Sequence, residues 1–155
     1  GSAFWIEMPF GARKEKVVTK GFEEPAKLTE LNCTVLYIED NPANMTLMEM
    51  FALRIPGLAL TCAPSAELGI ELAQSNQPDL IIMDVNLPQM SGFDAFAVLK
   101  RTEKTEKIPV IAVSAVAMQE DISKGIDAGF RYYLTKPFDL ITLKNTIADV
   151  LSLEN

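Results

Sequence analysis

The stretch from Leu80 to Gly92, LIIMDVNLPQMSG, indicates the fold of this chain. Leu80–Met83 is a continuous apolar run of strand length, which is typical of a strand buried on both faces of a parallel sheet. The run ends at a carboxylate, Asp84, and a helix is predicted to begin at Gly92. The stretch therefore predicts one strand–loop–helix unit with an acidic side chain at the carboxyl end of its strand.

The same unit recurs along the chain from Thr34 onward. Apolar runs of strand length alternate there with amphipathic stretches of helix length. The predicted strands are Thr34–Ile38, Leu58–Cys62, Leu80–Met83, Val110–Val113 and Arg131–Leu134. The predicted helices are Pro42–Arg54, Ser65–Gln74, Gly92–Arg101, Met118–Ala128 and Asp139–Leu153. Repeated units of roughly 22 residues predict an α/β fold, a doubly wound five-stranded parallel sheet with helices on both faces.

Composition narrows the class of function. The 155 residues are 48% hydrophobic, enough for a full core, and the formal net charge is −7. An acidic chain is poorly suited to nucleic acid or to anionic lipid, so neither is an expected partner. The sequence has no histidine, which excludes histidine-based zinc sites and Ser-His-Asp triads on this chain. Without an apolar run long enough for a membrane or a visible signal peptide, we expect a cytoplasmic location.

Polar residues follow four of the predicted strands. Glu39 and Asp40 follow the first, Asp84 the third and Ser114 the fourth, and Lys136 comes two residues after the fifth. The carboxyl ends of parallel strands meet at one edge of the sheet, where such folds bind ligands. Three carboxylates there repel one another unless a cation neutralises them, and an all-oxygen cluster suits Mg²⁺. A lysine and a hydroxyl beside them could hold a phosphoryl group.

Each of these residues also has an ordinary structural interpretation. An acidic pair after a strand is often a solvated loop, Ser114 could cap a helix, and Lys136 before Pro137 could be plain surface. The functional interpretation rests on all of them meeting at one edge.

The motifs that carry these residues resemble the receiver (response regulator) family. They are YIEDNPAN at 37–44, MDVNLPQMSG at 83–92, VIAVSA at 110–115 and YYLTKPF at 132–138. The resemblance covers about Thr34 to Leu153, and Asp84, Pro88 and Gly92 stand at the family's intervals. It implies the flavodoxin-like receiver fold and a phosphoacceptor in a two-component phosphorelay.

By this resemblance, Asp84 is the phosphoacceptor and Mg²⁺ is the cofactor. The implied metal-site residues are Asp40 and Asp84 as ligands, the backbone carbonyl of Asn86 as a further ligand, and Glu39 as a second acid that acts largely through water. The implied phosphoryl-binding groups are Ser114, the backbone N–H of Ala115 and Lys136. Ser114 and Tyr133 would form the conformational switch, although a plain strand aromatic fits Tyr133 equally well. The Lys136–Pro137 bond is expected to be cis.

The resemblance also implies the partners. The phosphodonor or acceptor would be a histidine kinase or a histidine phosphotransfer protein, and a homodimer stays open. The fragment would assist its own phosphorylation and dephosphorylation, so whether it counts as an enzyme is left open. Two departures from the family's usual pattern are mild: Glu rather than Asp at 39, and Ser rather than Thr at 114.

The first thirty residues look different from the rest. Residues 1–10, GSAFWIEMPF, resemble the last strand of the ATP-binding domain of sensor histidine kinases, although Gly1 and Ser2 also fit a cleavage scar. Residues 11–32 are predicted to be a linker and residues 33–155 the receiver. The parent would then be a hybrid sensor kinase, with a membrane anchor as one option. We expect Phe4, Trp5 and Ile6 to pack on the chain's own receiver or on another molecule's sheet edge.

Two other classes of function compete with this hypothesis. One is a receiver-like interaction module that never carries phosphate, but such copies usually lose the acceptor, an acidic ligand or the lysine. The other is a Mg²⁺-dependent phosphatase with an aspartyl nucleophile, which normally has a second acid two residues later, where this chain has Asn86.

Overall fold

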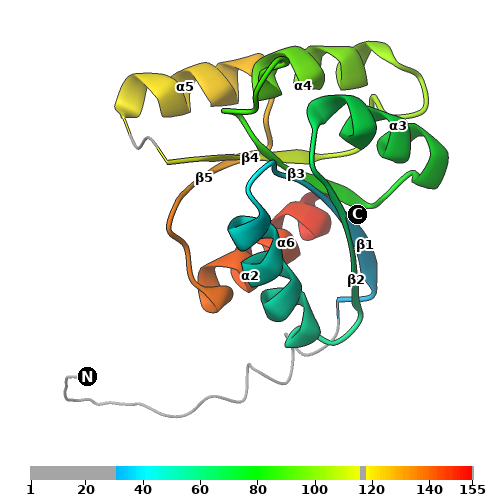
Figure 1. Ribbon diagram of the computed structural model, residues 1–155, viewed down its shortest axis with the longest axis vertical. Helices are drawn as coiled ribbons and strands as arrows, with labels where there is room; N and C mark the ends of the chain where they lie inside the picture. Colours follow the sequence, from blue (N-terminus) through cyan, green and yellow to red (C-terminus); the bar gives the residue numbers. More distant parts are fainter. Residues whose placement is uncertain (1–30, 116–117, 155) are drawn as a thin grey trace. The chain divides into compact units, whose positions relative to one another are not determined.

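A computed structural model describes residues 31–115 and 118–154 of the chain. The strands are β1 (Cys33–Ile38), β2 (Leu58–Ala63), β3 (Leu80–Asp84), β4 (Val110–Ser114) and β5 (Tyr132–Thr135). The helices are α2 (Pro42–Leu53), α3 (Ala66–Asn76), α4 (Gly92–Arg101), α5 (Gln119–Ala128) and α6 (Leu140–Glu154). The five strands form one parallel sheet in the order β2-β1-β3-β4-β5 (Figure 1).

Helices cover both faces of this sheet. α3, α4 and α5 lie on one face, and α2 and α6 lie on the other (Figure 1). The strand order reverses beside β1, where the chain changes from one face to the other, as in doubly wound folds. The predicted fold class is therefore confirmed.

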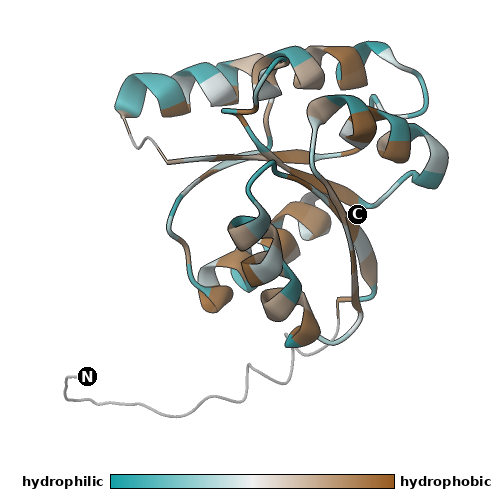
Figure 2. Cartoon of the chain, viewed as in Figure 1, coloured by the Kyte–Doolittle hydropathy of each residue, from teal (hydrophilic) through white to brown (hydrophobic). Residues whose placement is uncertain are grey.

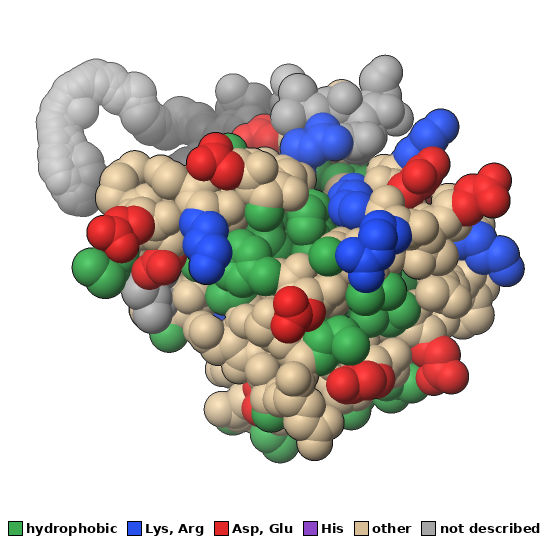
Figure 3. Space-filling view, turned by 90° about the horizontal axis from the view of Figure 1, so that it is seen from above, with side chains coloured by type: hydrophobic (Ala, Val, Ile, Leu, Met, Phe, Trp, Pro, Cys, Tyr) green, Lys and Arg blue, Asp and Glu red, His purple; other side chains and the backbone are tan. Residues whose placement is uncertain are grey.

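The strands have two buried faces because their side chains alternate. Leu36 and Ile38 of β1 enter the core under α3, α4 and α5, whereas Val35 and Tyr37 enter the core under α2 and α6. The central strands are apolar on both faces for this reason, and they are brown along their length in Figure 2. On the outer side of α3, α4 and α5, charged side chains surround smaller apolar areas (Figure 3).

The element boundaries lie within two residues of the predicted ones. Asp84 and Ser114 are the last residues of β3 and β4, because parallel pairing continues to them: Asp84 pairs with Val113, and Ser114 with Thr135. α5 begins at Gln119, with Met118 as its N-cap.

Helix α2 is less amphipathic than predicted. Of its apolar residues Met48 is buried, whereas Leu47, Met50 and Leu53 are 46%, 57% and 86% exposed.

The described part of the chain begins at Leu31, two residues before the predicted receiver boundary. The backbone N–H of Leu31 donates to the Pro56 carbonyl at 3.1 Å, and the Leu31 side chain packs against the core under α2 and α6. The expected packing of Phe4, Trp5 and Ile6 lies outside the described residues. Within 31–115 and 118–154, none of the helices has the length and apolar character required to span a bilayer.

Candidate functional site

The carboxyl edge of the sheet brings together the residues predicted from the strand ends. Asp84 ends β3, Ser114 ends β4, and Glu39 directly follows β1. Lys136 follows β5, where its backbone N–H donates to the Ser114 carbonyl at 2.8 Å. The parallel register therefore places side chains that are up to 97 residues apart in sequence within hydrogen-bonding distance.

Lys136 forms ion pairs with two buried carboxylates. Its Nζ lies 2.9 Å from Glu39 Oε1 and 2.9 Å from Asp84 Oδ2. Glu39 is 1% exposed and Asp84 5% exposed, so both charges are largely removed from water. Buried carboxylates are tolerated only when they are paired, and here one ammonium group pairs with both.

Backbone and side-chain donors complete the surroundings of the two carboxylates. Asp84 Oδ1 accepts a hydrogen bond from the Asn86 backbone N–H at 2.8 Å, and Glu39 Oε2 accepts one from the Asn41 N–H at 3.2 Å. The Asn86 side chain donates to Ser114 Oγ at 3.4 Å, which links the loop after β3 to the end of β4. Asp84, Ser114 and Lys136 thus belong to one hydrogen-bonded network.

The pKa values of the three groups shift in different directions. Burial raises the pKa of Asp84, and the hydrogen bonds from Lys136 and the Asn86 N–H offset only part of that rise. Burial also acts to raise the pKa of Glu39, but the hydrogen bonds from Lys136 and Asn41 outweigh it and leave this pKa below its usual value. Burial acts to lower the pKa of Lys136, but its bonds to Asp84 and Glu39 outweigh this effect and raise it.

The acidic cluster has the chemistry of a site for a hard cation. One carboxylate oxygen from each of Glu39, Asp40 and Asp84 lies within 4.8 Å of the others, and Asp40 is exposed while the other two are buried. Oxygen ligands of this kind, partly open to water, are what Mg²⁺ prefers. The residues present therefore fit the cofactor that the sequence predicted.

The remaining predicted residues lie around this cluster. The Lys136–Pro137 peptide bond is cis. Ala115 directly follows β4 and is exposed. Tyr133 lies in β5 and is half-buried, with its side chain packed against the core under α3, α4 and α5. The structure brings the predicted residues together, and the role of each one in binding metal or phosphoryl remains a prediction.

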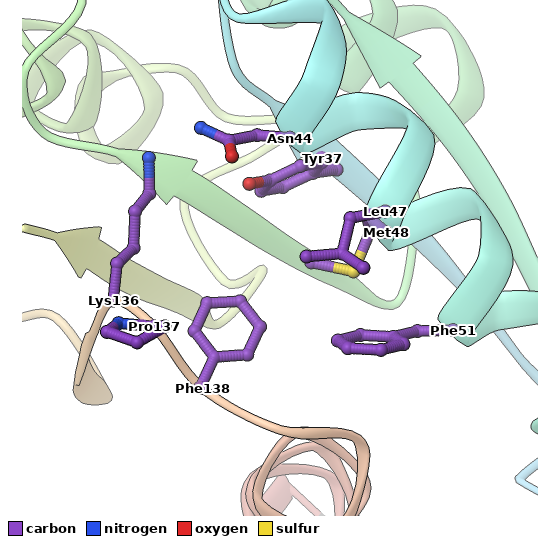
Figure 4. A pocket seen from close by; sticks show the side chains of 8 residues that line it. All are labelled: Tyr37, Asn44, Leu47, Met48, Phe51, Lys136, Pro137 and Phe138. Atoms are coloured by element: carbon purple, nitrogen blue, oxygen red, sulfur yellow. The ribbon is translucent and has the colours of Figure 1, made fainter.

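Sequence reasoning missed one residue of the network, Tyr37. Its hydroxyl donates to Glu39 Oε1 at 3.0 Å, although Tyr37 was interpreted only as part of an apolar strand. Strand periodicity could have indicated this contact, because side chains two residues apart point to the same face. Tyr37 also lines a cavity of about 100 Å³ beside the site, together with Lys136 and apolar residues of α2 (Figure 4).

Comparisons with known proteins give the family. Residues 35–148 match the sequence profile described as the response regulator receiver domain. The chain belongs to the response regulator receiver family. It is therefore a receiver domain of two-component signal transduction.

Individual relatives agree with this assignment. This receiver is 35% identical over 118 residues to the polar-differentiation response regulator DivK of Brucella ovis. The matched region covers 76% of this chain and 95% of DivK. It is also 35% identical over 118 residues to hybrid signal transduction histidine kinase G of Dictyostelium discoideum, covering 73% of this chain but 3% of that protein.

A solved structure shows the same fold. The receiver domain of sensor histidine kinase PA1611 from Pseudomonas aeruginosa, described with a magnesium ion coordinated in its active site cleft, superposes on this receiver with a TM-score of 0.71. The two chains are 30% identical, and the superposition covers 79% of this chain and 99% of the other.

Proposed function

We propose that this receiver takes a phosphoryl group from a phosphohistidine onto Asp84 and that Mg²⁺ is bound at Glu39, Asp40 and Asp84. The observation that carries the proposal is the Glu39–Lys136–Asp84 network, with Lys136 Nζ at 2.9 Å from both carboxylates. A nucleophilic carboxylate, further carboxylates for a cation and a mobile ammonium group are the parts that phosphoryl transfer requires.

In the proposed reaction, the Asp84 carboxylate attacks the phosphorus atom of the donor. A bond forms between Asp84 oxygen and phosphorus, the phosphorus–nitrogen bond breaks, and the donor imidazole leaves. When bound, Mg²⁺ supplies positive charge that offsets the charge developing on the transferred oxygens. Lys136 moves from the carboxylates to a phosphoryl oxygen, and Ser114 Oγ and the Ala115 N–H donate to the others. The Asn86 carbonyl is a further proposed metal ligand.

Phosphorylation of Asp84 is reversible in the proposed cycle. Water attacks the phosphorus, the Asp84 carboxylate leaves, and inorganic phosphate is released. While Asp84 is phosphorylated, Ser114 is drawn toward the phosphoryl group and Tyr133 turns inward. These movements shift the population of conformations at the β4–α5–β5 face toward a signalling form. A ring of Tyr133 that is equally mobile before and after beryllofluoride binding would argue against this switch.

We also propose that the receiver belongs to a hybrid sensor kinase. Two observations support this: hybrid kinase G is a relative at 35% identity, and the structurally similar PA1611 domain comes from a sensor histidine kinase. The kinase-like motif in residues 1–10 is consistent with that origin. The donor or acceptor would then be a histidine residue of the kinase or of a phosphotransfer protein, and the location would be cytoplasmic.

Transfer from a phosphohistidine tests the proposal. A phosphotransfer protein carrying labelled phosphohistidine is mixed with this chain and Mg²⁺, and the label is followed on both proteins. We expect the label to move to this chain, and to stay on the donor with the Asp84→Asn variant. Retention on every donor tried, by a folded chain, would instead favour a phosphate-independent interaction module.

A further inference from the structure

Tyr37 contacts Glu39 of the acidic cluster and has no role in the reaction described above. Tyr37 and Glu39 are two residues apart, so their side chains point to the same face of the strand. The Tyr37 hydroxyl donates to Glu39 Oε1 at 3.0 Å, and the tyrosine itself is 2% exposed. A buried hydrogen bond to a charged group is among the stronger hydrogen bonds in proteins.

Three donors fix the Glu39 carboxylate. Tyr37 and Lys136 both donate to Oε1, at 3.0 Å and 2.9 Å, and the Asn41 backbone N–H donates to Oε2 at 3.2 Å. Lys136 is shared with Asp84, and the proposed reaction moves it to the phosphoryl group. The hydrogen bond from Tyr37 is therefore the side-chain contact that would keep Glu39 Oε1 in place once Lys136 has moved.

Packing in the core fixes the position of the Tyr37 ring. It lies in the core under α2 and α6 with Met48, and Figure 4 shows it on the wall of the cavity with its hydroxyl turned to the side where Lys136 lies. A phenol fixed by packing on its ring can hold a carboxylate without further ordering. The donor is thus preorganised before any cation arrives.

We propose that Tyr37 is a positioning residue for the Mg²⁺ site and that its hydroxyl is matched to a glutamate at position 39. The inference rests on the proposed function, because it requires Mg²⁺ to bind beside Glu39. An aspartate at 39 is one methylene shorter, so it would lose the 3.0 Å contact with the Tyr37 hydroxyl. Tyr37 and Glu39 therefore act as a pair in holding the cation.

Equilibrium Mg²⁺ binding tests this pairing. Amide chemical shifts are followed by NMR as Mg²⁺ is added to the whole chain, for the unchanged protein, Tyr37→Phe, Glu39→Asp and the double variant. Because partners that hold a metal ligand usually change affinity by about 10–100-fold, and Glu39 is one of several carboxylates, we expect Tyr37→Phe to raise the dissociation constant about three- to tenfold. Tyr132→Phe, at an exposed position in β5, is the matched control and should leave it unchanged.

The double variant separates positioning from general destabilisation. If the hydroxyl acts through Glu39, Tyr37→Phe will change the dissociation constant less than about twofold in the Glu39→Asp background. Equal effects in both backgrounds, or an unchanged constant for Tyr37→Phe alone, would overturn the inference and leave the proposed function intact. Failure of the unchanged chain to bind Mg²⁺ would overturn both.

Discussion

Lys136 pairs with two carboxylates at once, and its single positive charge leaves them unequal. Asp84 keeps a raised pKa because burial and the nearby Glu39 outweigh its hydrogen bonds, whereas Glu39 keeps a lowered one. Part of the repulsion between the clustered negative charges therefore falls on Asp84. Asp84 is the proposed phosphoacceptor, so its proposed role is opposed to the stability of the fold.

The raised pKa of Asp84 gives a prediction on stability. Because the folded state binds the Asp84 proton more tightly than the unfolded state does, ionisation of this group costs stability once the pH exceeds its folded pKa. In EDTA near pH 7 we expect Asp84→Asn to be more stable than the unchanged chain.

The advantage of Asp84→Asn should shrink as the pH falls through the raised folded pKa of Asp84, because the carboxyl then takes up a proton in the folded unchanged chain. Urea denaturation at several pH values measures it. An advantage that stays constant with pH, or a less stable variant near pH 7, would contradict the electrostatic explanation.

At the scale of elements, α5 and β5 meet through a glycine. A Cβ atom at Gly125 would lie 2.5 Å from Tyr133 Cδ2, so α5 can pack against the Tyr133 ring only with no side chain there. α5 also begins differently from its neighbours. The N-caps of α2, α3 and α4 (Asn41, Ser65 and Ser91) accept from the first turn, whereas the α5 N-cap, Met118, makes no such bond. Both features lie beside the proposed switch.

Gly125→Ala should displace the Tyr133 ring. Overpacking costs typically 1–3 kcal/mol and alanine gains about 1 kcal/mol of helix propensity, so we expect a net loss of about 1 kcal/mol. In a Tyr133→Ala background the same change should stabilise the chain, because the clash is gone. Urea denaturation of the four proteins and the Tyr133 ring signals in NMR measure this. Equal effects in the two backgrounds would mean that the ring is not what limits position 125.

Met118→Ser should stabilise α5. A serine N-cap can accept from the first turn and is worth about 0.5–2 kcal/mol over a residue that cannot. Met118 is 60% exposed, so its replacement removes little buried surface. Amide hydrogen exchange within α5 measures the gain, with Ser91→Ala in α4 as the opposite control. Unchanged protection in α5 would show that its start is fixed by other contacts.

How well each strand or helix was predicted depends on how its side chains are buried. β3 and β4 are apolar on both faces, and periodicity placed them to within one residue. The ends of β3 and β4 were missed because pairing, which depends on the neighbouring strand, extends them onto the polar residues Asp84 and Ser114. The exposed apolar residues of α2 were missed because composition does not reveal which side of a helix meets the sheet.

For the whole molecule, the sequence predicted which residues meet but not how they pair. Parallel topology was enough to bring Glu39, Asp84 and Lys136 to one edge. That Lys136 would form ion pairs with both carboxylates depends on side-chain reach and burial, which sequence patterns do not encode. The Tyr37 hydroxyl was missed because Tyr37 was interpreted only as an apolar strand residue, although its spacing of two residues from Glu39 could have indicated the contact.

The proposed phosphorylation of Asp84 with the help of a bound cation can be measured by intact mass spectrometry. The chain is incubated with acetyl phosphate and Mg²⁺, with Asp84→Asn and an EDTA-treated sample in parallel. We expect one phosphoryl adduct on the unchanged chain, and none on the variant or in EDTA. An adduct that persists in Asp84→Asn, or that forms equally well in EDTA, would overturn the proposal.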